Sequence, residues 1–164
     1  MARSSWDSLS YRPLPALWEP ALSLFSFAGA WAPALESLAT CWGAWESERL
    51  CGALLAERAG ASAMLHGPVV VAPPDAPSEA AIEVARRLVA DALTQAQADG
   101  IETLFTRPQG LDRIWVRSGF IPVPEAELPR PLRGRPGVGL FGWRGGTALW
   151  SSAGRGAARP RSLR

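Results

Sequence analysis

The stretch that decides the fold is residues 64–105, where the run MLHGPVVV (64–71) and the turn APPDAPS (72–78) lead through a long amphipathic segment to IETLF (101–105). The two apolar runs predict strands, and the segment between them predicts a helix. Two strands joined by a helix predict a parallel pair with a right-handed crossover. Backbone N–H groups at the start of such a helix can bind an anion such as a pyrophosphate.

The predicted helix runs from Ser78 to Asp99 and has one apolar stripe at steps of three and four residues. The stripe comprises Ala81, Ala85, Leu88, Val89, Ala92, Leu93 and Ala96. We expect it to pack on the sheet. Asp75 or Ser78 can cap its start, Pro77 suits its first turn, and Gly100 suits the left-handed position after its end.

The rest of the chain predicts further elements on both sides of this unit. Before it we expect a strand over 8–14, helical segments over 16–28 and 31–38, and a three-strand antiparallel meander over 40–48, 50–57 and 62–71. After it we expect a strand over 101–106, a short helix over 111–118, and strands over 120–123 and 137–144. The proline-rich loop 124–136 between the last two is a candidate lid.

Composition predicts one globular domain. The chain has 164 residues, of which 48% are hydrophobic and 20% charged, enough for a single stable core. Its net charge is only +2, and all of its basic residues are arginines. We predict a domain over 1–150 and a disordered basic tail over 151–164, since the arginines there are separated by Gly, Ala, Pro and Ser. A nucleic-acid partner is not expected.

Cys41, Cys51 and His66 lack the spacing of a zinc site, so no metal is expected and both cysteines are predicted to be reduced core residues. No apolar stretch is long enough to span a bilayer, and the first residues lack a signal-peptide pattern. We therefore expect a soluble cytoplasmic protein without a membrane partner.

The order of these elements resembles that of the GCN5-related N-acetyltransferase (GNAT) fold, and three local phrases resemble it too. They are Val71-Ala72-Pro73 after a strand, residues 96–104 at a helix-to-strand step, and residues 115–120 (WVRSGF) at an aromatic-x-x-x-Gly-Phe turn. The likeness covers residues 8–145. It implies an α/β (α+β) single-domain fold with a mixed, mostly antiparallel sheet, a central parallel strand pair splayed at the cofactor site, and helices on both faces.

The resemblance also implies that acetyl-CoA, or another acyl-CoA, binds as co-substrate. The pantetheine would contact the backbone of Val69 and Val71. The pyrophosphate would lie on a Gln/Arg-x-x-Gly-x-Gly/Ala loop at the start of the next helix, which counting back from Gly100 aligns with residues 80–85. Here the basic residue is absent and Glu83 replaces the central glycine. The implied cofactor-binding residues on that helix are Ala81, Ile82, Glu83, Val84 and Ala85.

Three residues are candidates for catalysis. His66 has the only side chain that ordinarily titrates near neutrality, so it is a candidate general base, or else a hydrogen-bonded core histidine. Glu46 could act as a base through water or bind a cationic substrate, or it could be an exposed hairpin charge like Glu48. Trp115 stands where the family commonly has a tyrosine acid, and its indole N–H can donate a hydrogen bond but not a proton at neutral pH.

Two functional interpretations remain open. The first is an acyl-CoA-dependent N-acyltransferase, in which the amine of a small molecule or peptide attacks the thioester directly. The alternative is a non-catalytic GNAT-like module that has lost effective CoA binding and acts through protein contacts, which the departures at residues 80–85 and 115 favour. Either could be a monomer or a homodimer.

Overall fold

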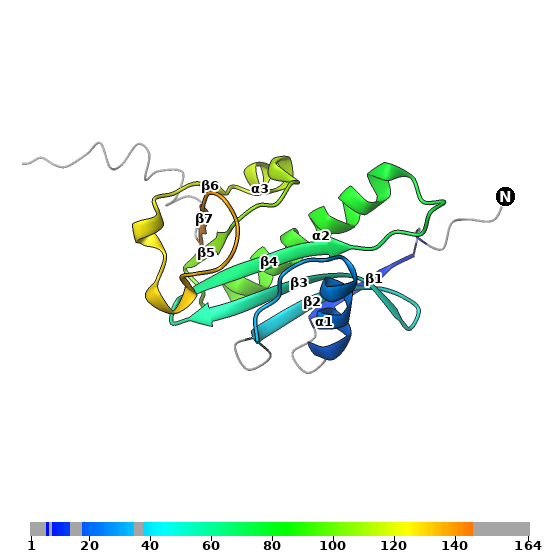
Figure 1. Cartoon of the computed structure of the whole chain (residues 1–164), viewed down its shortest axis with the longest axis horizontal. Coiled ribbons are helices and arrows are strands. Elements are labelled where there is room, and N and C mark those ends of the chain that lie inside the picture. The colour runs from blue at the N-terminus through cyan, green and yellow to red at the C-terminus, as the bar shows by residue number, and fades with distance from the viewer. Residues whose placement is uncertain (1–5, 7, 14–17, 35–37, 146–164) are drawn as a thin grey trace, which may run out of the picture.

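The computed structural model describes Trp6 and residues 8–13, 18–34 and 38–145 (Figure 1). In this part of the chain, one sheet has the strand order β1-β2-β3-β4-β5-β7-β6. The strands are β1 (Ser10–Pro13), β2 (Leu38–Glu46), β3 (Arg49–Ala59), β4 (Ser62–Val70), β5 (Thr103–Thr106), β6 (Ile121–Pro122) and β7 (Phe141–Arg144). Neighbouring strands are antiparallel except β4 and β5, which are parallel. The predicted mixed sheet is confirmed.

The strands β2, β3 and β4 form the predicted antiparallel meander. The turn between β2 and β3 lies at Ser47 and Glu48, where Ser47 has a positive φ of 53°, and Glu46 pairs with Arg49 across it. Glu48 is therefore a turn residue and not a strand residue. The cysteines behave as expected, since Cys41 and Cys51 are buried and form no disulfide.

The helix α2 (Ser78–Ala98) covers one face of the sheet. Its buried residues are Val84, Ala85, Leu88, Val89, Ala92 and Ala96. They share a core with Leu54 of β3 and Leu65 of β4. The sheet approaches the helix closely at Gly52, where an added Cβ would lie 3.2 Å from a Val84 methyl and 3.3 Å from a Leu88 methyl. A larger residue at this position would push the two layers apart.

The ends of α2 agree with the sequence in part. Gly100 has a φ of +72° just after the helix, as predicted. At the other end Pro77 occupies the N-cap position with an extended backbone, and no side chain caps the helix. The predicted caps, Asp75 and Ser78, are thus wrong, because Ser78 is already the first helical residue. The N–H groups of residues 78–80 have no carbonyl of a preceding turn to bond, apart from the short bond from Ala80 to Pro77.

The opposite face of the sheet carries two separate covers. The helix α1 (Trp18–Phe27) packs through Ala21 and Phe25 against β2, β3 and Val69 of β4. The chain between β6 and β7 contains two short 3₁₀ turns, η3 (Glu125–Glu127) and η4 (Arg130–Leu132), and packs its leucines on Met64 and Phe105. Figure 1 shows α1 and α2 on opposite sides of the sheet, with this loop at the end formed by the β3–β4 hairpin. The candidate lid is therefore a packed part of the core.

The parallel pair is short. β4 and β5 pair only from Ser62 with Thr103 to Leu65 with Thr106, while β4 continues along β3 as far as Val70. Prolines follow the last pair on both strands, Pro68 in β4 and Pro108 after β5, and proline has no N–H to extend a ladder. The two strands therefore part beyond Leu65, and the predicted splay is present.

Some predictions differ from the structure or lie outside it. The helical segment predicted over 31–38 is absent from the described residues, because 31–34 are irregular and Leu38 begins β2. The chain turns after Gly29, whose φ is +69°, and Pro33 removes an N–H donor. The predicted tail over 151–164 lies outside the described residues. Within those residues, no helix has the length and apolarity to cross a membrane.

The packing of α2 gives a test of the fold. Replacing Leu88, which has no exposed surface, with alanine removes apolar contacts between the helix and three strands. We expect Leu88→Ala to lower the free energy of unfolding by about 2–5 kcal/mol. The control is Val138→Ala, at a side chain that is 94% exposed, which should change it by less than about 0.5 kcal/mol. Urea denaturation followed by circular dichroism measures both, and equal effects would contradict the packing.

Candidate functional site

The splay leaves backbone groups of β4 without a strand partner. Val71 donates its N–H to the Cys51 carbonyl at 2.8 Å, and Val69 pairs with Ala53 in the same register. Because polar groups alternate in direction along an antiparallel strand, Val69 and Val71 both direct theirs toward β3. The N–H and C=O of Val70 point the other way, into the splay. The backbone available to a ligand is thus that of Val70, between the two residues expected from the sequence.

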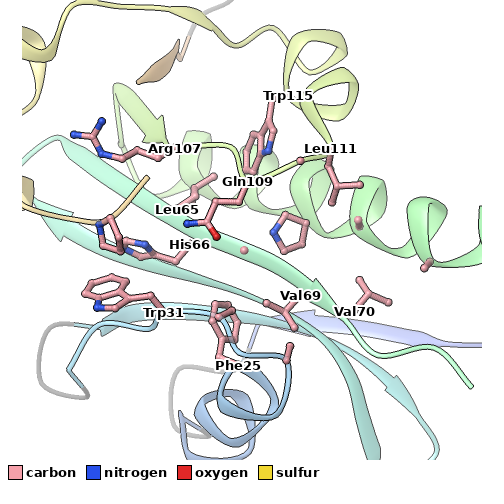
Figure 2. A pocket seen from close by; sticks show the side chains of 18 of the residues that line it. Phe25, Trp31, Leu65, His66, Val69, Val70, Arg107, Gln109, Leu111 and Trp115 are labelled. Carbon is pink, nitrogen blue, oxygen red and sulfur yellow. The ribbon is translucent and has the colours of Figure 1, made fainter. Parts of the chain in front are cut away.

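A cavity of about 380 Å³ opens at this point. Figure 2 shows its walls: Phe25 and Trp31 on one side, β4 with His66, Val69 and Val70 across the middle, and Arg107, Gln109, Leu111 and Trp115 on the other side. Ala81, Ile82 and Ala85 of α2 and Pro136 of the loop complete the lining. Most of the wall is apolar, and only His66 and Arg107 among its residues have basic side chains.

His66 belongs to a buried cluster of charged groups. Its Nε2 lies 2.7 Å from Oε1 of Glu57, on the neighbouring strand β3. Glu57 also accepts two hydrogen bonds from Arg135, from Nε to Oε1 at 2.9 Å and from Nη2 to Oε2 at 2.7 Å. The residues Glu57 and His66 are 2% and 8% exposed. Two strands and the β6–β7 loop therefore meet in one hydrogen-bonded chain that ends at the cavity wall.

The electrostatics of the cluster favour an ionised glutamate and a neutral histidine. Burial raises the pKa of Glu57, but the hydrogen bonds and charges of Arg135 and His66 outweigh it, so the pKa lies below its ordinary value. Burial lowers the pKa of His66, and the attraction of Glu57 offsets this only in part. The histidine is therefore uncharged at pH 7. With Nε2–H donated to the carboxylate, the Nδ1 lone pair is the group able to accept a proton.

The sequence indicated His66 but missed its two partners. Glu57 closes the predicted strand 50–57, and its alternation places it on the same face as Leu55, which pairs with His66. A carboxylate on a buried strand face beside the single histidine was a usable signal. Arg135 was not accessible in this way, because it is 78 residues from Glu57 and lies in an irregular loop.

Trp31 lies over the histidine. The two ring centroids are 5.1 Å apart and the rings are tilted by 59°. Trp31 remains 42% exposed, so the other part of its indole surface is open. It comes from the irregular segment after α1, where the sequence had predicted a helix. It therefore provides an aromatic surface beside the titratable group.

The other two catalytic candidates lie in different surroundings. Trp115, on α3 (Asp112–Arg117), forms part of the cavity wall but is almost fully buried, with its ring edge-on to Phe120 at 4.9 Å. Glu46 ion-pairs with Arg49 at the β2–β3 turn and is not part of the cavity lining. The structure thus brings His66 and Trp115 to one cavity, and leaves Glu46 outside it.

Of the cofactor-binding residues predicted on α2, four lie inside the helix and one lies in its first turn. Residues 82–85 lie inside the helix, where their N–H groups bond to the preceding turn, and Val84 is buried in the core. Glu83 is exposed and ion-pairs with Arg86, which lowers its pKa. Ala81 is the one member of the set that belongs to the first turn. The donors suited to an anion are those of residues 78–80.

A second cavity, of about 700 Å³, lies between α2 and α3. It shares Ile82, Gly110 and Leu111 with the first cavity, so the two adjoin. Its charged residues are Arg86, Arg113, Arg117 and Asp112. Together the cavities form a path from an arginine-rich groove, past Ala81 and Ile82 of α2 and the splay, to His66.

Comparisons with known proteins identify the fold. No protein-family model and no curated protein sequence matches the chain. A GNAT-family acetyltransferase from Staphylococcus aureus Mu50 superposes with a TM-score of 0.61 at 10% identity, over 84% of this chain and 99% of that one. N-acetylglutamate synthase from Neisseria gonorrhoeae, solved with coenzyme A and N-acetylglutamate, gives 0.63 at 17% identity, over 84% and 35%.

The catalytic domain of the Tetrahymena GCN5 histone acetyltransferase, solved with coenzyme A, gives a TM-score of 0.57 at 14% identity, over 83% of this chain and 92% of that one. Identities this low establish architecture only. The chain has the GNAT fold.

Proposed function

We propose that this protein is an acyl-CoA-dependent N-acyltransferase that transfers an acetyl group to a primary amine. The observation that carries the proposal is the carboxylate-bound imidazole of His66 in the wall of the cavity at the splay of β4 and β5. A neutral histidine held by a buried glutamate is a suitable general base for an amine nucleophile. Two proteins of the same fold were solved with coenzyme A.

Three features support binding of an acyl-CoA along the path between the two cavities. Arg113 and Arg117 would attract the phosphates of its nucleotide end. The first-turn N–H groups of α2 would donate to the diphosphate. The N–H of Val70 would donate to the pantetheine arm or to the thioester oxygen where the strands part. Glu83 is no obstacle in this arrangement, because Arg86 neutralises it.

The proposed chemistry needs one base. Nδ1 of His66 takes a proton from the acceptor ammonium, and the free amine attacks the thioester carbonyl carbon. A C–N bond forms and the carbonyl π electrons move to oxygen, where a backbone N–H such as that of Val70 can stabilise the negative charge. Collapse breaks the C–S bond, one of the two protons on the attacking nitrogen passes to the thiolate, and the other remains as the amide N–H. The histidine then releases its proton to water, so the products are an amide and a free thiol.

Glu57 and Arg135 are positioning residues in this scheme. Glu57 fixes the histidine ring through Nε2, and Arg135 keeps Glu57 ionised and in place. Trp115 does not serve as an acid, because an indole N–H does not ionise near neutral pH. It closes the α3 side of the cavity. The proton for the departing thiol comes from the amine itself.

One feature favours the non-catalytic alternative. The first turn of α2 contains the acidic residue Glu79 and no basic residue, and a negative charge there opposes a diphosphate. A GNAT-fold protein with this turn could act through protein contacts alone. Direct measurement of acyl-CoA binding separates the two functions.

Acetyl-CoA binding tests the proposed path. We expect calorimetry to give a dissociation constant in the micromolar range. The double variant Arg113→Ala, Arg117→Ala should weaken binding at least about tenfold, or about 1.4 kcal/mol, because two cations leave the groove. The matched control is Arg130→Ala, an exposed arginine on the distant η4 turn, which should leave the affinity unchanged. No binding by the unmodified protein would support the non-catalytic alternative and exclude the enzyme.

The pH dependence of turnover tests the base. His66→Gln should lower kcat by roughly 10²- to 10⁴-fold and leave acetyl-CoA affinity unchanged. Since burial lowers the pKa of His66, kcat of the unmodified protein should fall only below the ordinary pH range of histidine. Glu57 raises that pKa, so Glu57→Gln should move this acid limb to still lower pH. A kcat of His66→Gln equal to that of the unmodified protein would contradict the assignment of the base.

A further inference from the structure

The half of the cavity beside His66 is lined mainly by apolar side chains, with Gln109 and Arg107 as its other polar members (Figure 2). One wall consists of Phe25, Ala30 and Trp31, and the other elements add Pro68, Val69 and Pro136. Phe25 is held in place by the backbone of β4: a Cβ added at Gly67, whose φ is +100°, would lie 3.0 Å from its ring. This half therefore offers hydrophobic contact to the part of a substrate that does not react.

The charges around this half are unfavourable to a second positive group. Among the residues that the structure describes, no aspartate or glutamate lines the cavity. Glu57 lies behind His66 with both carboxylate oxygens bonded to Arg135 and His66. Of the described lining residues, only Arg107 carries a permanent charge. Its side chain is 9% exposed and donates to both oxygens of Glu125 at 2.6 and 2.7 Å. A further cation in the cavity would lose its water shell without gaining a counterion.

Among the described lining residues of this half, Trp31 is the one large side chain that is both exposed and in contact with the imidazole of His66. A ring stacked on its open part would place an attached aminoalkyl group near Nδ1 of His66. Aromatic pairs of this kind stabilise contacts beyond the area that they bury. The small volume of the cavity suits a small molecule better than a peptide segment.

From these contacts we infer that the acceptor, within the proposed N-acyltransferase function on which this inference rests, is a small primary amine attached to an aromatic or apolar group and carrying no second positive charge. Trp31 is the specificity-determining residue, and the lack of a carboxylate among the described lining residues disfavours diamines and polyamines. The amine nitrogen lies toward His66 and the ring toward Trp31 and Phe25.

The first experiment compares amines that differ in one group, with acetyl-CoA as donor and release of free thiol as the readout. n-Hexylamine and 1,5-diaminopentane differ chiefly in a terminal methyl against a terminal ammonium. We expect kcat/KM to be at least about fiftyfold higher for hexylamine, and higher again for phenethylamine. Equal or better use of 1,5-diaminopentane or spermidine would overturn the inference and leave the N-acyltransferase function standing.

The second experiment examines Trp31. Trp31→Ala should raise KM for phenethylamine at least about tenfold, change KM for acetyl-CoA little, and reduce the preference for phenethylamine over hexylamine. Trp31→Phe should restore most of the loss. An unchanged KM for phenethylamine in a Trp31→Ala protein with the circular dichroism and melting temperature of the unmodified protein would overturn the role of Trp31.

A third measurement does not depend on turnover. Ligand-observed NMR with phenethylamine should show saturation transfer to its ring protons in the unmodified protein, weaker transfer in Trp31→Ala, and none to 1,5-diaminopentane. If acetyl-CoA does not bind, the proposed function fails, and this measurement still decides whether the cavity takes aromatic amines. No transfer to phenethylamine would overturn the inference whether or not acetyl-CoA binds.

Discussion

The structure depends on β4, which pairs over a long stretch with β3 and over a short one with β5. β4 remains hydrogen-bonded to β3 as far as Val70, but β5 accompanies it for only four pairs. Prolines on both strands prevent the parallel ladder from continuing, and α2 holds the two strands on one core in spite of the gap. The unpaired backbone, the cavity and the position of His66 at its wall all result from this early end of the pairing.

The buried charges near the gap add little net stability, because the cost of removing an ion pair from water offsets much of the attraction between its charges. What the cluster does provide is a fixed orientation. Glu57 and His66 lie on adjacent strands of a rigid sheet, and Arg135 satisfies the remaining acceptors of the carboxylate. The imidazole is thereby held by the sheet and not by a mobile loop.

Much of the architecture was predictable because it follows from local patterns. The stripe of α2, Gly100 after its end and the polar β2–β3 turn each give a short-range signal, and the parallel pair follows from the strand-helix-strand order. The cap of α2 was mispredicted because Asp and Ser favour N-cap positions in general, but here Pro77 occupies that position. The helix over 31–38 was mispredicted because Pro33 interrupts an otherwise apolar run.

The site was less accessible to sequence analysis. His66 could be indicated because it is the only histidine, whereas Arg135 reaches Glu57 across the fold from a loop without periodicity. The residues expected to face a cofactor on β4 and α2 were close to the available backbone but displaced along it. On β4, the bulge at Gly67 and Pro68 decides which residue directs its backbone groups into the gap. On α2, the free N–H groups are set by the residue at which the helix begins, Ser78.

The loop between β6 and β7 links the size of the cavity to the orientation of the base. Pro136 lines the cavity, and the preceding residue, Arg135, holds Glu57. Gly137 packs closely on Arg107: a Cβ added at Gly137 would lie 2.6 Å from the Cβ of Arg107. There is therefore little free space between this part of the loop and Arg107. A substrate too bulky for the cavity would displace Pro136 and Arg135 together. In the proposed reaction, such a substrate would bind more weakly. It would also react more slowly once bound, because His66 would no longer be aligned with the amine.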